Sequence, residues 1–149
     1  MKVVDTAEYL STLRTLTEGG SEVNVVISGG SMNPFLVHGR DSVCFKKPDR
    51  ALKKGDMVFY QRENGQFVMH RIVGISPYGC DLLGDAQTEV EHGVRREQIF
   101  GLVTRVRRKG RWLEPGDFWW FFFEKIWIHL IPLRRVMMRL YPLLRRGRG

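Results

Sequence analysis

Short apolar runs separated by glycine-containing turns fill the middle of the chain, from about residue 22 to residue 107. Short runs rich in valine, isoleucine and phenylalanine are typical of β-strands. We expect strands over the ranges 23–27, 42–46, 56–62, 66–75, 81–83, 98–107 and 112–113. Asn64-Gly65 lies between the third and fourth of these, and this dipeptide is a strong hairpin signal. The pattern predicts a mostly antiparallel β fold, either a coiled sheet or a partly open barrel.

The segment before the strands has a helical pattern. Its apolar residues recur at helical spacing and predict an amphipathic helix over residues 5–17, which the glycines at 19 and 20 would end. Residues 1–22 carry several charges and no long apolar run. Neither a cleavable signal peptide nor an N-terminal membrane anchor is therefore expected.

After Pro115-Gly116 the chain becomes aromatic and then basic. Residues 118–133 hold three tryptophans and four phenylalanines. This stretch is short for a transmembrane helix and contains Glu124, Lys125 and His129, which are costly at the centre of a bilayer. The pattern favours an amphipathic helix in a membrane interface over residues 117–149. The alternative is that the aromatic side chains pack over the sheet or between subunits.

The patterns together divide the chain into three parts: an N-terminal helix (1–20), a β domain (21–114) and an aromatic, arginine-rich segment (115–149). The formal net charge is +8, and residues 134–149 contain six arginines and no acid. Such an excess suits an anionic membrane surface or nucleic acid. A solvated basic tail is the alternative interpretation.

The two cysteines, Cys44 and Cys80, are far apart and lack the spacing of metal ligands. No metal and no other cofactor is expected. A disulfide between these cysteines is left open.

Three polar patches interrupt the predicted strands. In the first, S-G-G-S-M-N-P at 28–34, Ser31 follows two glycines and precedes a proline by three residues. Glycine permits a tight turn with close backbone approach, which would expose a nucleophile together with its own N–H group for an oxyanion. An ordinary loop would have the same composition.

The other two patches contain one histidine and one acid. His70 lies inside the apolar run V-M-H-R-I-V at 68–73, and Asp85 follows the strand at 81–83. Histidine is the natural base for a serine nucleophile, and an acid can orient its ring. A structural histidine and an aspartate that binds its own turn are the alternatives.

In this order and at these spacings, the patches resemble the signal peptidase I family, including the LexA-like peptidases that share its fold. The resemblance covers about residues 23–106. It is carried by S-G-G-S-M-N-P at 28–34, G-R-D-S-V at 39–43, L-K-K-G-D-M-V-F-Y at 52–60, V-M-H-R-I-V-G-I at 68–75, L-G-D-A-Q at 83–87 and I-F-G-L-V at 99–103. The G-R-D-S-V block has one residue more than the family's simple G-D form. The N-terminal membrane anchor that is typical of the family is not expected from residues 1–22.

The resemblance implies a serine endopeptidase with Ser31 as nucleophile and His70 as general base. Most bacterial members have a lysine where this chain has His70, so the chain is similar to the histidine-using, endoplasmic-reticulum-type signal peptidases. The backbone of Ser31 would help to form the oxyanion hole. Ser28, Gly30 and Met32 are the expected oxyanion and substrate-binding residues.

The resemblance leaves the third catalytic group open. Asp85 is favoured as the acid that orients His70. Glu89 and Glu91 are the alternatives, because the endoplasmic-reticulum-type enzymes place an acid a few residues further on.

The implied substrate is an extended signal or leader peptide, cleaved at or near a membrane to which the protein is bound peripherally. A LexA-like regulator that cleaves itself is one alternative. We expect no DNA-binding domain in the residues before Ser31, which counts against it, as does the histidine base. Nucleic acid is not the expected partner. A maturation protease dedicated to one secreted or modified peptide is the other alternative.

Overall fold

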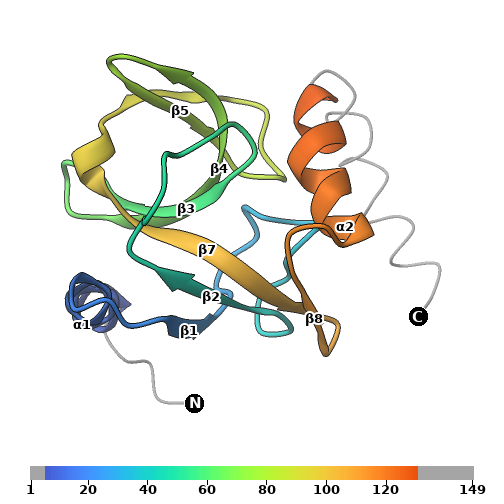
Figure 1. The fold of residues 1–149 in the computed structure, drawn as a ribbon, viewed down its shortest axis with the longest axis horizontal. Coiled ribbons are helices and arrows are strands. Elements are labelled where there is room, and N and C mark those ends of the chain that lie inside the picture. Colours follow the sequence, from blue (N-terminus) through green and yellow to red (C-terminus); the bar gives the residue numbers. More distant parts are fainter. Residues whose placement is uncertain (1–5, 131–149) are drawn as a thin grey trace.

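The computed structural model describes residues 6–130 of the chain. The fold is mostly β, with one helix before an eight-stranded antiparallel sheet and a helical segment after it (Figure 1). The strands are β1 (Val23–Val26), β2 (Ser42–Lys46), β3 (Met57–Gln61), β4 (Phe67–Ser76), β5 (Gly79–Leu83), β6 (Glu91–Val94), β7 (Ile99–Arg108) and β8 (Arg111–Leu113). The prediction of a mostly antiparallel β fold is confirmed.

The strands follow the order β1-β2-β7-β3-β4-β5-β6, and β8 pairs with the end of β7. The long strand β7 joins the two parts of the sheet, because it pairs with β2, β3 and β8. In Figure 1, β3, β4 and β5 curl around one end of the molecule, whereas β1, β2 and β8 lie at the other. The sheet is open, with β1 and β6 as the two ends of the order.

One strand, β6, has no counterpart among the predicted elements. Its sequence, E-H-G-V, is polar, and only its last residue is buried. It pairs with β5 at the edge of the sheet, where the side chains of a strand need not be apolar. Hydrophobic patterning therefore misses it, although the strand contains Glu91.

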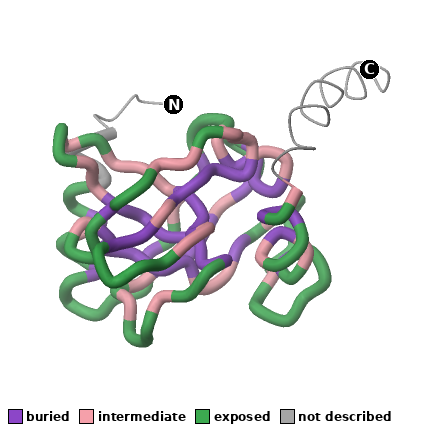
Figure 2. Tube along the Cα trace, turned by 90° about the horizontal axis from the view of Figure 1, so that it is seen from above, coloured by how far each residue is buried: buried purple, intermediate pink, exposed green. Residues whose placement is uncertain are grey.

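Both faces of the β3–β4 hairpin are covered. Met57 and Phe59 belong to the larger hydrophobic cluster, while Val58 and Tyr60 belong to a second cluster. Successive side chains of a strand point to opposite faces, so the unbroken apolar run at the start of β3 reflects burial on both. Figure 2 shows the buried positions running through the strands and the exposed positions in the connecting loops.

The helical segments before and after the sheet in the sequence both contribute residues to the larger hydrophobic cluster. In α1 (Thr6–Glu18), Leu13 is buried in that cluster. The C-terminal segment begins as α2 (Phe118–Phe121) and continues through a π-helical turn, η2 (Phe122–Ile126), into a short 3-10 helix, η3 (Trp127–His129). A 3-10 turn, η1 (Arg96–Gln98), precedes β7.

The aromatic residues of this segment differ in burial, and Phe122 is partly buried against the larger cluster. Trp120, Phe123 and Trp127 are buried in the larger cluster. Phe118, Trp119 and Phe121 are exposed. The buried residues therefore pack over the sheet, whereas Phe118, Trp119 and Phe121 remain exposed to solvent within the described part of the chain.

Between residues 6 and 130 the chain forms no helix that is both long and apolar enough for a membrane span. The arginine-rich stretch at 134–148 lies outside the described residues.

Candidate active site

Ser31 lies half-buried in the turn that follows β1. Three hydrogen bonds fasten this turn: the N–H of Gly29 donates to His38 Nδ1 (2.9 Å), that of Asn33 to the carbonyl of Gly30 (3.1 Å), and that of Ala86 to the carbonyl of Ser31 (2.9 Å). Gly29 has a φ of 81°, in the region that favours glycine. The glycines thus form the tight turn that the sequence predicts.

The residues around Ser31 differ in exposure. Ser28 and Gly30 are exposed, so their polar backbone groups lie at the surface beside the serine. Met32 is only 2% exposed and belongs to the larger hydrophobic cluster. Its side chain therefore anchors the turn in the core. The expectation that Met32 belongs to the oxyanion and substrate-binding residues stays a prediction.

The loop that follows β5 lies directly against the serine. A Cβ atom on Gly84 would collide with the carbonyl oxygen of Ser31. Gln87 closes this loop, because its Oε1 accepts a hydrogen bond from the N–H of Gly84 (3.0 Å). The G-D motif is thus tied to the serine turn by backbone contact, and a side chain at position 84 would force the two apart.

Asp85 is engaged by Arg71. Arg71 Nε and Nη2 donate to the two carboxylate oxygens of Asp85 at 2.9 Å each, and Nη1 donates to the carbonyl of Gly55 at 2.9 Å. Both side chains are almost wholly buried. The Arg71 guanidinium also lies 5.5 Å from the centre of the Phe35 ring. Asp85 therefore pairs with Arg71, where the sequence favoured a contact with His70.

His70 lies on β4 and is 3% exposed. Its Nδ1 is 3.2 Å from Tyr60 Oη. The Tyr60 hydroxyl also donates to Glu91 Oε2, and Arg62 Nε donates to Glu91 Oε1 at 2.8 Å. We call these four residues, His70, Tyr60, Glu91 and Arg62, the histidine cluster.

The surroundings of the histidine cluster set its protonation. Burial, helped by the positive charge of Arg62, lowers the pKa of His70 to about 4, although Glu91 opposes this. Burial and the neighbouring Glu91 raise the pKa of Tyr60. Burial would raise the pKa of Glu91, but hydrogen bonds from Tyr60 and Arg62 outweigh it, so this pKa is lowered. Near neutral pH the cluster therefore holds a neutral imidazole, a protonated hydroxyl and a carboxylate.

The strand register brings the serine turn toward His70. Arg71 pairs with Leu83, the last residue of β5, and His70 is the residue just before Arg71. The chain then enters the Gly84 loop that touches Ser31. Ser31 Oγ and the His70 ring are not joined by a hydrogen bond in the described part of the chain. Catalytic hydrogen bonds in free enzymes are often long and tighten when substrate binds.

Sequence reasoning missed Tyr60, Arg62 and His38 as members of the site, and it named Glu91 only as an alternative. The signal for Tyr60 lay in the hairpin. The turn around Asn64-Gly65 sets a register in which Tyr60 pairs with Val68, so Tyr60 and His70 share one face of the sheet. The signal for His38 was weaker, because its contact with Gly29 depends on the path of a loop.

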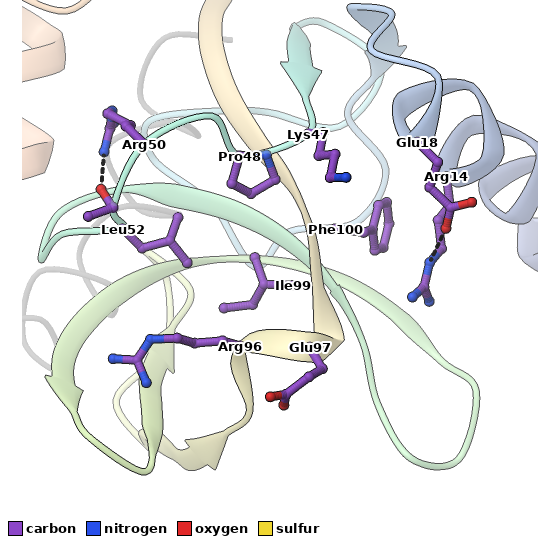
Figure 3. Close-up of a pocket in the computed structure, with 11 residues that line it drawn as sticks. Arg14, Glu18, Lys47, Pro48, Arg50, Leu52, Arg96, Glu97, Ile99 and Phe100 are labelled. Carbon is purple, nitrogen blue, oxygen red and sulfur yellow. Dashed lines mark hydrogen bonds and ion pairs between the residues drawn. The ribbon is translucent and has the colours of Figure 1, made fainter.

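Figure 3 shows a groove of about 780 Å³ in another part of the protein, between α1, the loop before β3 and the start of β7. None of the predicted site residues lines it. Two of its cations are already bound, since Arg50 pairs with Asp56 and Arg96 donates to the carbonyl of Ser76. We assign no ligand to this groove.

In the described part of the chain, no group of three or more histidine, cysteine, aspartate or glutamate side chains could hold a metal ion. Cys44 and Cys80 are both free and buried. Comparison with protein-family models, curated proteins and solved structures found no match to this chain.

Proposed function

We propose that this protein is a serine endopeptidase of the signal-peptidase type, with Ser31 as nucleophile and His70 as general base. The observation that supports the proposal most is the state of His70. Its ring is neutral and held at Nδ1 by Tyr60. It also lies next to the end of β5, where the Gly84 loop meets Ser31. The ordered motifs from residue 28 to residue 103 support the same activity.

In the proposed reaction, Ser31 Oγ attacks the carbonyl carbon of the scissile bond while its proton passes to His70 Nε2. The resulting oxyanion accepts a hydrogen bond from the N–H of Ser31, with further help from the exposed backbone at Ser28 and Gly30. His70 then gives its proton to the leaving amine as the C–N bond breaks. His70 then takes a proton from water, whose oxygen attacks the acyl carbon. As the Ser31 Oγ–carbon bond breaks, His70 returns the proton to Oγ and the carboxylic acid product leaves.

The proposed substrate is an extended peptide that adds a strand to β1. This strand ends the sheet order and leads directly into the serine turn. Val26, its last residue, is 56% exposed. Main-chain hydrogen bonds to an edge strand give affinity without demanding a particular sequence. A signal or leader peptide with small residues at the cleavage site suits such an edge.

Cleavage of a signal-peptide-like substrate by wild type, Ser31→Ala and His70→Gln tests the proposal. We expect both variants to lose activity by a factor of about 100 or more, since general acid–base catalysis alone contributes about 10²–10⁴-fold. Circular dichroism would check that the variants fold. Equal turnover by all three proteins would refute the catalytic assignment.

The same preparations distinguish the alternatives. Intact-mass measurement of the incubated wild-type chain would reveal self-cleavage, and DNA binding that falls steeply with salt would favour a regulator. Cleavage of one precursor from a peptide panel, with no cleavage of general signal peptides, would favour a dedicated maturation protease.

We also propose that the exposed aromatic residues of the C-terminal segment bind an anionic membrane surface. We call this set, Phe118, Trp119 and Phe121, the outer aromatic face. Each of its members is at least 40% exposed. The Trp119 ring packs edge-on against Phe118 and lies 5.3 Å from the guanidinium of Arg108. Aromatic rings with cations beside them are typical of interfacial segments, and the net charge of +8 matches anionic lipid.

Co-sedimentation of the full chain with vesicles tests this proposal. We expect binding to phosphatidylserine-containing vesicles and at least about tenfold weaker binding by Phe118→Ser/Trp119→Ser, since each buried aromatic contributes about 1.5–3 kcal/mol. Tyr78→Ser is the matched control, because Tyr78 is exposed on the turn between β4 and β5. Deleting residues 117–149 would remove the buried Trp120 and Trp127 as well, so point variants are the sharper test. Unchanged binding by the double variant would refute the proposal.

A further inference from the structure

Tyr60 stands between the histidine and the acid of the histidine cluster. Its side chain is fully buried, and its hydroxyl contacts both His70 Nδ1 and Glu91 Oε2. In the β3–β4 register, Tyr60 pairs with Val68 and His70 with Val58, so the two rings are diagonal neighbours on one face of the sheet. Glu91 reaches the same place from β6, on the far side of β5.

The hydrogen bonds of the Tyr60 hydroxyl determine which nitrogen of His70 carries the proton. A tyrosine hydroxyl has one proton to donate, and a carboxylate can only accept. The hydroxyl proton therefore goes to Glu91, and the oxygen of Tyr60 has only lone pairs left for His70. Its contact with Nδ1 then requires that Nδ1 carries the imidazole proton. A neutral imidazole with a proton on Nδ1 has a free lone pair on Nε2.

We propose that Tyr60 is a positioning residue that relays the orientation of Glu91 to His70 and holds the ring in the tautomer with a free Nε2. This inference rests on the proposed function, in which Nε2 accepts the proton of Ser31. It differs from a triad in which an acid binds the histidine directly. Here the Tyr60 hydroxyl lies between Glu91 and His70, so the carboxylate does not contact the imidazole directly.

The contacts of Glu91 and Asp85 explain why this role falls to Tyr60. Both carboxylate oxygens of Asp85 are occupied by Arg71. One oxygen of Glu91 is held by Arg62 and the other by Tyr60. Arg62 thus holds the Glu91 carboxylate in place, the carboxylate orients the Tyr60 hydroxyl, and the hydroxyl oxygen accepts the proton on His70 Nδ1.

Nitrogen NMR of protein labelled at histidine tests the inference directly. Long-range proton–nitrogen correlations distinguish a protonated from a bare ring nitrogen, and His70→Gln assigns the signals of His70. In wild type near pH 7.5 we expect Nδ1 to be protonated and Nε2 to be bare. In Tyr60→Phe we expect this preference to be lost. A protonated Nε2 in wild type, or an unchanged tautomer in Tyr60→Phe, would overturn the inference.

Kinetics supply a second readout. Tyr60→Phe removes the hydroxyl and keeps the aromatic ring. We expect kcat to fall by about 10- to 100-fold, because part of the acid–base contribution is lost, with little change in KM. Tyr78→Phe is the matched control, since it removes the hydroxyl of an exposed tyrosine, and it should change neither kcat nor the His70 spectrum. Unfolding in urea checks that Tyr60→Phe is folded.

Glu91→Gln keeps the inference falsifiable if Tyr60→Phe does not fold. The glutamine amide can donate to Tyr60 Oη and free the hydroxyl proton for His70 Nδ1. We therefore expect Glu91→Gln to move the tautomer toward a protonated Nε2. An unchanged tautomer would count against the relay.

The two proposals fail in different ways. The expected tautomers together with no peptide cleavage by wild type would leave the relay in place and refute the peptidase. Cleavage that depends on Ser31 and His70, with no effect of Tyr60→Phe on kcat or tautomer, would refute the relay and leave the peptidase.

Discussion

His70 and Arg71 are neighbours in β4, yet their side chains lie on opposite faces of the strand and in different surroundings. Arg71 faces Phe35 of the larger cluster, and its hydrogen bonds go to Asp85 and Gly55. His70 faces Tyr60 of the second cluster, and its Nδ1 is hydrogen-bonded to the Tyr60 hydroxyl. Both are buried polar residues in an apolar strand.

The difference lies in how completely each group is satisfied. Arg71 and Asp85 bind each other at two points and are closed to solvent. Removing one partner of such a buried pair leaves the other charge buried without compensation, which destabilises the folded protein. The histidine cluster instead reaches the surface, because Arg62 and Glu91 are each 31% exposed. The saturated pair is thus closed on all sides, whereas the histidine cluster is open to solvent at its Arg62–Glu91 pair.

Breaking the saturated pair should have the largest effect on stability. Arg71→Met leaves Asp85 buried without its partner, and we expect the free energy of unfolding to fall by about 3–5 kcal/mol. Urea denaturation followed by circular dichroism measures this. Arg71→Met/Asp85→Leu removes both charges and should recover most of the loss. A change below about 1 kcal/mol in Arg71→Met would contradict the structural role of the pair.

The buried imidazole should make stability depend on pH. The pKa of His70 is lowered from 6.5 to about 4 in the folded protein. Between these values the unfolded chain binds more protons than the folded one, so stability is greatest above about pH 6.5 and falls as the pH drops toward 4. The full loss corresponds to about 3 kcal/mol.

Unfolding free energies between pH 4 and pH 7 measure this dependence, and His70→Gln should remove the part due to His70. The acid limb of kcat/KM should lie nearer pH 4 than pH 6.5 for the same reason. An identical pH dependence of stability in wild type and His70→Gln would contradict the burial of His70.

The contact between the Gly84 loop and Ser31 should be sensitive to added volume. Gly84→Ala would push the loop from the carbonyl of Ser31, and we expect a loss of about 1–3 kcal/mol in stability, as for overpacked sites. Peptidase activity should also fall in the protein that remains folded, because the displaced loop moves the serine turn. Gly19→Ala is the control, since a Cβ there has only an ordinary contact. Equal activity of the two variants would show that the loop does not position Ser31.

The half-exposed pair should contribute least to stability. Glu91→Gln breaks an arginine–carboxylate pair like that of Asp85, but one that solvent screens, so we expect a loss of about 1 kcal/mol or less. Activity should nevertheless fall by about tenfold or more if the cluster performs catalysis. Glu89→Gln, at an exposed position, is the control and should change neither stability nor activity. A stability loss as large as that of Arg71→Met would erase the contrast between the two faces of β4.

Much of the fold could be predicted from the chain because the determinants are local. Residues 42–46 form a strand with the predicted bounds, and the Asn64-Gly65 hairpin joins β3 to β4 as expected. The polar strand β6 was missed because its pairing, and not its hydrophobicity, makes it a strand. The C-terminal aromatic residues could not be sorted into packed and exposed sets, because helical spacing does not say which face meets the sheet.

The sequence by itself determined the mostly antiparallel β architecture and the choice of Ser31 and His70 as candidates, since both follow from turn residues, periodicity and the order of motifs. Only the tertiary structure decided what the acids do. In the sequence, Asp85 was favoured over Glu89 and Glu91 as the acid that orients His70. Their roles differ because the pairing of β4, β5 and β6 brings Arg71 to one of them and Tyr60 to another. The contact between Tyr60 and Glu91 joins β3 to β6 across two other strands, and the local patterns of either strand do not encode it.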